Sequence, residues 1–203
     1  RKVFLLTSYD IDSFNNKKKN FSEKYNVELI YFQEEKPLGE CGGLWKIKKY
    51  LDDDFLFLGG DLIWDVDISR VNEFHKMNGS SITLLTHISS HPFDSDLIIE
   101  SKSKEIKKFL CKPHTGNDID SVFLGNAGIS IINKKLLEIY HPPDQPISLF
   151  KYLSNLNKKN NIRIFSYNTS EFIKDIGTPD RLTKTEKLLE TQGIKKYSYS
   201  KRQ

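Results

Sequence analysis

The sequence is poor in cysteine: its 203 residues contain only two, Cys41 and Cys111. Two cysteines cannot form a disulfide scaffold or a four-cysteine zinc site, so the protein classes that depend on either are excluded. Free thiols persist in reducing compartments, and no secretory leader is visible in the sequence. We therefore expect a cytoplasmic setting.

The sequence also lacks a long apolar run and a strong charge of one sign. No stretch of about 18 apolar residues is present, so no transmembrane helix is expected. Lys and Arg number 31 against 27 Asp and Glu, which gives a formal charge of +4. This excess is too small to indicate nucleic acid by itself. We expect neither a membrane nor a nucleic acid as a partner.

Several widespread catalytic signatures are missing. The sequence contains no Gly-x-Ser-x-Gly turn, no phosphate loop ending in Gly-Lys-Ser/Thr, no Gly-x-Gly-x-x-Gly fingerprint and no His-Glu-x-x-His pair. These absences argue against a serine hydrolase, a P-loop nucleoside triphosphatase, a dinucleotide-dependent enzyme and a zinc peptidase.

What is present is enough apolar material for a sizeable core, with 37% hydrophobic and 12% aromatic residues. Apolar periodicity predicts strands and helices that alternate along the chain. The predicted strands cover residues 3–7, 27–32, 55–58, 81–88, 97–99, 106–110, 127–132, 162–167 and 171–174. The predicted helices cover residues 11–25, 43–51, 68–78, 134–140, 147–158 and 179–192. This order predicts a mostly parallel sheet with helices on both faces.

In such sheets ligands bind beyond the carboxyl ends of the strands, so residues that directly follow strands are candidates for chemistry. The segment 34–43 follows a strand and has three glycines in its last five residues. Glycines let the backbone approach a flat ligand, and a helix start exposes N–H groups. Glu34 or Glu35 could accept two hydrogen bonds from guanine. The alternative, which the spacing alone favours, is an ordinary polar strand-to-helix turn.

Two aspartates follow other strands. Asp61 comes after two glycines at the end of the apolar strand 55–58, which is predicted to be covered on both faces. An oxygen ligand there suits Mg²⁺, although a turn aspartate bonding its own backbone is the alternative. Asp175 precedes a helix start in which Thr178 is the N-cap and Pro179 the first helical residue. The cap leaves Asp175 unexplained, and we hypothesise that it meets Asp61 in a metal site.

Two weaker clusters remain. Lys112 lies at a strand end, where a phosphate ligand would be, although a surface lysine is the simpler interpretation. Asn126-Ala127-Gly128 begins a predicted strand, and its small residues leave room for a sugar ring or serve packing equally well.

Five motifs stand in one order: Pro37-Leu38-Gly39 with Gly42-Gly43, Gly60-Asp61, Lys112-Pro113, Asn126-Ala127-Gly128, and Asp175-Ile176-Gly177-Thr178-Pro179-Asp180-Arg181. The set resembles the sugar-1-phosphate nucleotidylyltransferases over about residues 3–190. It is most similar to the mannose-1-phosphate and D-glycero-D-manno-heptose 1-phosphate guanylyltransferases, and segments 91–97 and 112–114 favour the heptose branch. The resemblance implies a Rossmann-like, three-layer α/β/α fold of the GT-A type with a mostly parallel mixed sheet.

The resemblance also implies a reaction. A sugar 1-phosphate oxygen would attack the α-phosphorus of a nucleoside triphosphate, here GTP, and pyrophosphate would leave. No covalent enzyme intermediate is needed, so catalysis would rest on positioning and charge neutralisation. The implied roles are Mg²⁺ binding and catalysis by Asp61 and Asp175, sugar-phosphate binding by Lys112, sugar binding by Asp96, Asn126 and Gly128, and nucleotide binding by Glu34, Gly39, Gly42 and Gly60.

The chain departs from the family at three positions and at its start. Cys111 stands where many relatives have Glu, and Glu40 and Cys41 replace small residues. The family begins with a strand and a Gly-x-Gly-Thr-Arg-Leu loop whose Arg is the main catalytic cation. This chain begins at Arg1, at what resembles the family's second strand.

The boundaries follow from that comparison. We expect an N-terminally incomplete nucleotidyltransferase domain at 1–192 and a tail or linker at 193–203, with both ends cut from a longer protein. The absent first strand would lie between the strands at 3–7 and 55–58, and this chain alone would not transfer nucleotide. A fused haloacid-dehalogenase-type phosphatase domain, as some relatives have, is compatible with the C-terminal end.

Two other functions stay open at this point. The first is a non-catalytic relative that binds a sugar nucleotide or a partner subunit. The second is a nucleotide-sugar glycosyltransferase, which would need an Asp-x-Asp metal motif. Asp65-Val66-Asp67 and Asp94-Ser95-Asp96 have that form. Neither follows a long buried strand as directly as Asp61, so this function ranks lower.

Overall fold

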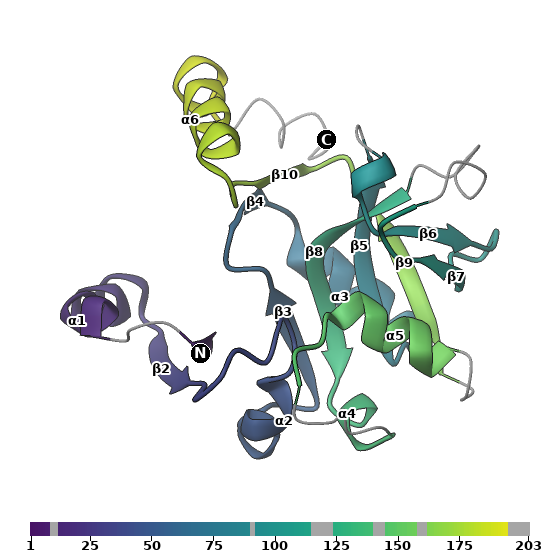
Figure 1. Ribbon diagram of the computed structural model, residues 1–203, viewed down its shortest axis with the longest axis horizontal. Coiled ribbons are helices and arrows are strands. Elements are labelled where there is room, and N and C mark those ends of the chain that lie inside the picture. Colours follow the sequence, from purple (N-terminus) through teal and green to yellow (C-terminus); the bar gives the residue numbers. More distant parts are fainter. Residues whose placement is uncertain (9–11, 90–91, 115–123, 140–144, 158–161, 195–203) are drawn as a thin grey trace.

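A computed structural model describes residues 1–8, 12–89, 92–114, 124–139, 145–157 and 162–194 of the chain (Figure 1). The strands are β1 (Lys2–Thr7), β2 (Glu28–Gln33), β3 (Asp54–Leu58), β4 (Leu62–Asp65), β5 (Ile82–Ile88), β6 (Leu97–Glu100), β7 (Ile106–Leu110), β8 (Leu124–Asn133), β9 (Ile164–Asn168) and β10 (Phe172–Asp175). The helices are α1 (Asp12–Tyr25), α2 (Leu44–Ile47), α3 (Ile68–Met77), α4 (Leu136–Ile139), α5 (Leu149–Asn157) and α6 (Pro179–Gln192), with 3-10 turns η1 (Lys48–Tyr50) and η2 (Pro92–Asp94).

The largest sheet is built around β8. It has the strand order β7-β6-β8-β5-β9, and β3 also pairs with β8. Two smaller ribbons lie beside it in Figure 1: β1 with β2, next to α1, and β4 with β10, next to α6. None of the helices in the described part of the chain is long and apolar enough to cross a membrane.

The predicted mixed α/β class is confirmed, but the strand directions differ from the prediction. Among the described pairings, only β1–β2 and β5–β9 are parallel. The others are antiparallel: β8 runs against β3, β5 and β6, β6 and β7 form a hairpin, and β10 runs against β4. Helix–strand alternation in the sequence does not reveal such reversals.

Two apolar clusters cover the two faces of the sheet and make the fold three-layered. On one face α2, α4 and α5 pack against Ile82, Leu84 and Ile132. On the other, Val71 of α3 packs with Leu85 and with Ile129. The β4–β10 ribbon joins this second cluster through its own partly buried apolar side chains. Burial of these apolar surfaces is the main force that holds the layers together.

Strand β3 is not covered on both faces, so that prediction is wrong. Phe55 and Phe57 pack against the first apolar cluster. Leu56 and Leu58 are each 37% exposed. In the described chain β3 pairs only with β8 and β1 only with β2, so each strand keeps one edge without a partner. The exposed leucines lie along a groove between these two edges.

The predicted end of the last helix is confirmed, and one strand was not predicted. The Thr178 hydroxyl accepts a hydrogen bond from the Arg181 N–H at 3.3 Å, as an N-cap does. Gly193 ends α6 with φ +65°, a conformation that favours glycine.

Strand β4 was not predicted, since its four residues directly follow the turn at Gly60. Of the expected tail, residues 195–203 lie outside the described residues.

A buried polar cluster joins α3 to strands β3, β5 and β8. The His75 ring lies 2.9 Å from the Thr83 hydroxyl through Nδ1 and 3.4 Å from the Asp54 carboxylate through Nε2. Asn133 donates to the same carboxylate at 2.7 Å. Burial lowers the pKa of His75 below 6.5, and the Asp54 carboxylate opposes this shift.

Stability should therefore depend on the protonation of His75. Below about pH 6.5 the unfolded chain binds a proton that the folded chain resists, so the free energy of unfolding falls as the pH drops. The variant His75→Gln keeps a polar side chain but cannot titrate, and it should lose less stability between pH 7.5 and 5. Urea unfolding at several pH values measures this difference, and equal pH dependence of the two proteins would contradict it.

Candidate active site

The β4–β10 ribbon brings together the two aspartates that the sequence singles out. Asp175 pairs in register with Leu62, the residue after Asp61. The N–H of Ile176 donates to the Asp61 carbonyl at 2.8 Å, which extends the ladder by one step. Asp61 thus lies directly beside the end of β10, and the two aspartates are backbone neighbours across the ribbon.

The carboxylates of Asp61 and Asp175 converge on Gly177. A Cβ atom added to Gly177 would lie 2.6 Å from Oδ2 of Asp61 and 3.2 Å from Oδ1 of Asp175, so these two oxygens are within about 6 Å of each other. Asp175 Oδ1 accepts the Gly177 N–H at 2.7 Å, and Oδ2 accepts from Arg181 Nη1 at 2.8 Å. Glycine at 177 keeps the space between the carboxylates open.

This pair suits a magnesium ion that carries other ligands. Both groups are carboxylates, the hard oxygen donors that Mg²⁺ prefers. The described residues contain no cluster of three or more His, Cys, Asp or Glu that could hold a metal. Mg²⁺ commonly takes only one or two carboxylates and completes its shell with phosphates and water, so two converging aspartates fit it.

A groove of about 1570 Å³ opens next to the pair. It runs between β1 and β3 and past α6. Of the ten predicted site residues it brings together eight: Gly39, Gly60, Asp61, Asp96, Lys112, Asn126, Gly128 and Asp175. The other two, Glu34 and Gly42, are not among the residues that line it.

Asp96 directly precedes β6, and Lys112 follows β7 by one residue, so both lie at the open end of the β6–β7 hairpin. Asp96 Oδ1 accepts the Lys112 N–H at 3.0 Å, which ties the end of β7 to the start of β6. The Lys112 ammonium donates to the Asp94 carbonyl at 3.3 Å, and half of its side chain is exposed. The same ammonium lies 3.8 Å from the Asp94 carboxylate, so Lys112 brings to the groove a half-exposed cation in a surface ion pair.

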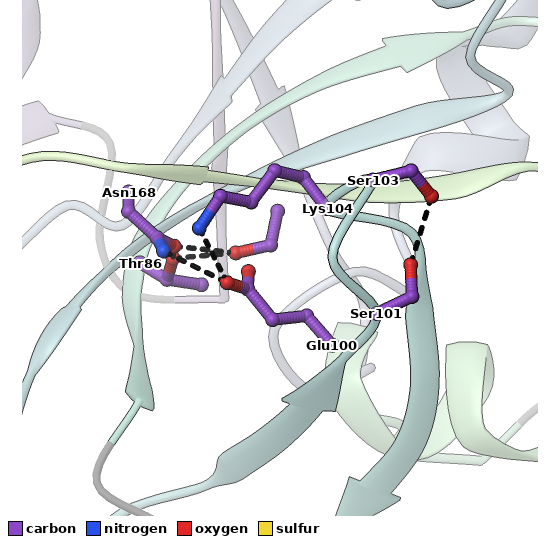
Figure 2. A network of polar contacts seen from close by, with 7 residues as sticks. Thr86, Glu100, Ser101, Ser103, Lys104 and Asn168 are labelled. Atoms are coloured by element: carbon purple, nitrogen blue, oxygen red, sulfur yellow. Dashed lines mark hydrogen bonds and ion pairs between the residues drawn. The ribbon is translucent and has the colours of Figure 1, made fainter.

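A polar network fixes this hairpin against β5 and β9 (Figure 2). The buried Thr86 hydroxyl bonds the Ser166 hydroxyl at 2.7 Å and the Asn168 amide oxygen at 2.5 Å. Asn168 donates in turn to Glu100 at 3.1 Å, and Lys104 pairs with the same Glu100 oxygen at 2.6 Å. The network reaches from the sheet to the hairpin turn and so sets where the hairpin places Asp96 and Lys112.

Asn126 and Gly128 lie on β8 beside the ribbon. Asn126 Oδ1 accepts the Gly128 N–H at 3.3 Å. Gly128 has φ +74°, and a Cβ there would lie 3.0 Å from the Leu62 side chain. Packing against β4 therefore accounts for this glycine, while the exposed part of Asn126 faces the groove.

The Glu34 carboxylate turns into its own loop. It is 8% exposed, and its Oε2 accepts the Leu38 N–H at 3.0 Å. A Cβ at Gly43 would meet Oε1 of Glu34, so glycine at that position lets the Glu34 carboxylate keep this orientation.

Two residues that the sequence marked only as departures, Glu40 and Cys41, join this loop to α5. Glu40 Oε2 accepts the Leu149 N–H at the start of α5 at 3.0 Å. The Cys41 N–H donates to the Ile147 carbonyl at 3.3 Å, and the Ile147 N–H donates to Leu38 at 2.9 Å. Their partners are far away in the sequence, so no local pattern could have identified these roles.

Burial governs the chemistry of both side chains. Burial raises the pKa of Glu40. The hydrogen bond from the Leu149 N–H lowers this pKa, and the negative charges of Asp96 and Asp61 raise it further. Burial raises the pKa of the Cys41 thiol to about 12, with the Glu40 carboxylate contributing. A thiol with so high a pKa is a poor nucleophile, so Cys41 serves packing.

Comparison with known proteins identifies the family. The profile of the nucleotidyl transferase family matches residues 1–192. The chain belongs to this family. A relative named mannose-1-phosphate guanylyltransferase catalytic subunit beta, from Drosophila pseudoobscura pseudoobscura, is 28% identical over 184 residues, which are 88% of this chain and 47% of the relative. A mannose-1-phosphate guanyltransferase of Aspergillus oryzae is 30% identical over 66% of this chain and 37% of the relative.

Solved structures show the same fold. HddC from Yersinia pseudotuberculosis superposes with a TM-score of 0.72 at 22% identity and covers 92% of this chain and 78% of its own. The same protein complexed with GMP-PN gives a TM-score of 0.69 at 21% identity, with coverages of 90% and 77%. The nucleotidyl transferase chain described here spans about half the length of the curated relatives it matches.

Two glycines of the groove offer a matched test of the loop geometry. Gly39 has φ +76°, and a Cβ there would lie 2.6 Å from the Ile147 nitrogen, whereas a Cβ at Gly60 would meet nothing within 4 Å. Gly39→Ala should lower the free energy of unfolding by about 2 kcal/mol or more, because it combines left-handed strain with a backbone clash. Gly60→Ala should change it by about 1 kcal/mol or less. Equal effects in urea unfolding would contradict the geometry.

Proposed function

We propose that this chain is the larger part of a domain that transfers GMP from GTP to a sugar 1-phosphate of the mannose or heptose type, with release of pyrophosphate, for sugar-nucleotide biosynthesis. The observation that carries the proposal is the convergence of Asp61 and Asp175 beside a large groove. The family membership supports nucleotidyl transfer, and the names of the sequence relatives support guanine and mannose 1-phosphate.

In this mechanism Asp61 and Asp175 would hold a Mg²⁺ ion against the phosphates. The ion would neutralise charge that grows on the non-bridging oxygens during the displacement. The protein itself would contribute alignment of the two substrates, which is worth several orders of magnitude in rate for a reaction between bound partners. Glycine at 177 is required because a methyl group would occupy the space between the two carboxylates.

The sugar 1-phosphate would bind at the β6–β7 hairpin side of the groove. Lys112 offers its half-exposed ammonium to the phosphate, and Asn126 and Asp96 offer hydrogen-bonding groups to the sugar hydroxyls. Gly128 lines the same groove and would lie beside the bound sugar. Because the network around Thr86 positions the hairpin, it would also set the distance between Lys112 and the metal.

The loop 34–43 would read the base, with Gly39 and Gly60 of the groove allowing close approach of the nucleotide. Glu34 is 8% exposed and Gly42 does not line the groove, so this proposal requires the loop to turn both toward the bound nucleotide. Glu34 uses Oε2 on the Leu38 N–H, and no described residue donates a hydrogen bond to its Oε1. A carboxylate at this position is complementary to the N1–H and amino group of guanine.

The role of Glu34 can be tested by base selectivity. Glu34→Gln replaces an acceptor oxygen by an amino group, which would face the donors of guanine, so GTP binding should weaken about tenfold or more while ATP and dTTP binding change little. Calorimetry with the three nucleotides on the full-length protein measures this. Equal weakening for all three would contradict the assignment.

We further propose that the domain 1–192 is completed by one more strand in the groove between β1 and β3. The two strand edges that face this groove have no partner in the described chain, and Leu56 and Leu58 lie along it, each 37% exposed. Unpaired edges with apolar flanks are ready to accept a strand. A preceding segment would supply that strand together with the loop that holds the triphosphate. Neither Cys41 nor Cys111 is in a disulfide, which supports a cytoplasmic setting.

Pyrophosphate release tests the proposed activity. The full-length protein should release pyrophosphate from GTP with mannose or heptose 1-phosphate, and the chain 1–203 alone should not. Asp61→Asn should lower kcat about 100-fold or more, because the metal would lose a ligand. Glu186→Gln, which removes an exposed carboxylate from α6 outside the groove, is the matched control and should leave kcat unchanged.

The outcomes separate an active nucleotidyltransferase from a non-catalytic relative that only binds a sugar nucleotide. Turnover by the full-length protein with loss in Asp61→Asn supports the transferase. Sugar-nucleotide binding without turnover would support the non-catalytic relative. Turnover by residues 1–203 alone would refute the need for a completing strand.

A further inference from the structure

Arg181 stands in an unusual place for a cation. It lies in the first turn of α6, three residues after the N-cap Thr178. Positive charge at a helix N-terminus is unfavourable because the helix dipole is positive there. A residue that breaks a local rule of this kind calls for an explanation in its contacts.

Its contact is the second carboxylate of the aspartate pair. Arg181 Nη1 donates to Oδ2 of Asp175 at 2.8 Å, while the Gly177 N–H occupies Oδ1. No described residue donates a hydrogen bond to the Asp61 carboxylate. The two aspartates therefore differ, because Asp175 has hydrogen-bond donors on both oxygens. A cation that approaches the pair meets one open carboxylate and one already neutralised by a guanidinium.

The two cations compete for Asp175. A metal ion bound to Oδ2 would lie within a few ångströms of the guanidinium, and the two positive charges repel. The ion pair can separate readily, since the side chains of Arg181 and Asp175 are 40% and 48% exposed and surface pairs of this kind are weak. A phosphate group in the groove would offer the freed guanidinium a better partner, because the planar guanidinium bonds two phosphate oxygens at once.

The groove provides that destination. Arg181 and Lys184, one turn apart on α6, line it together with Asp61 and Asp175. The same helix face therefore carries two cations toward the space in which the proposed function places the phosphates.

We propose that Arg181 is the counter-ion of Asp175 in the metal-free chain and moves to a phosphate oxygen of the substrate when a divalent cation takes Asp175. This inference rests on the proposed function for the identity of the phosphate. The exchange keeps the site near neutral in both states and makes tight metal binding depend on the arrival of phosphate.

The test compares Mn²⁺ binding with and without inorganic pyrophosphate, followed by the electron paramagnetic resonance of free Mn²⁺. With Mn²⁺ alone, Arg181→Ala should bind about fivefold more tightly than the unchanged chain, because the competing charge is gone. With saturating pyrophosphate the order should reverse, and Arg181→Ala should hold Mn²⁺ and pyrophosphate about tenfold more weakly.

Two further variants make the readings specific. Lys187→Ala removes a positive charge from the exposed side of the same helix, outside the groove, and should leave both affinities unchanged. Adding Asp175→Asn to Arg181→Ala should abolish the gain in Mn²⁺ affinity. Thermal unfolding of each variant checks that α6 stays folded, and a merely structural role for Arg181 would lower both affinities together.

Equal or weaker binding of Mn²⁺ alone by Arg181→Ala, including no detectable binding by either protein, would overturn the proposal. Unchanged or tighter binding in the presence of pyrophosphate would overturn the transfer to phosphate. These readouts need no turnover, so they stand apart from failure of the pyrophosphate-release assay, which would count against the proposed function instead.

Discussion

The site depends on one short ladder, the antiparallel pairing of β4 with β10. Its four residue pairs, extended by the bond from Ile176 to Asp61, hold the two aspartates side by side although they are far apart in the sequence. Leu62, Trp64 and Ile173 anchor the ribbon on the apolar cluster beneath it. The backbone pairing places the two aspartates side by side without any metal, and Arg181 and the Gly177 N–H offset the charge of Asp175.

The other groups around the groove are also positioned by contacts with segments that are distant in the sequence. The loop 34–43 is joined to the start of α5 through Glu40 and Cys41, and the β6–β7 hairpin is tied to β5 and β9 through the network around Thr86. Contacts with distant segments thus position both the loop and the hairpin. Such an arrangement leaves the groove-facing side chains of Lys112 and Asn126 available for a ligand.

Features that depend on neighbouring residues were the ones that the sequence predicted most directly. The cap at Thr178 and the stop at Gly193 depend on residues next to each other, and both are confirmed. The convergence of Asp61 with Asp175 was a hypothesis from the positions of two acids after two strands, and the register of β4 with β10 supplies the physical reason for it. Strand β4 itself was missed because four residues after a glycine turn carry too little pattern.

Three other misses depend on which segments meet in the fold. The antiparallel surroundings of β8 follow from which strands it meets, which alternation of helix and strand does not encode. The roles of Glu40 and Cys41 depend on α5, whose start lies far along the chain. Exposure of Leu56 and Leu58 departs from the expected burial because one edge of β3 has no partner in the described residues.

The central claim is that Asp61 and Asp175 bind one divalent cation together. A crystal of the protein soaked with Mn²⁺ tests it most directly through the anomalous scattering of the metal. The account predicts a single strong peak with a carboxylate oxygen of each aspartate at about 2.1–2.2 Å. A peak held by only one of the two, or no peak between them in a crystal that binds Mn²⁺ elsewhere, would contradict it.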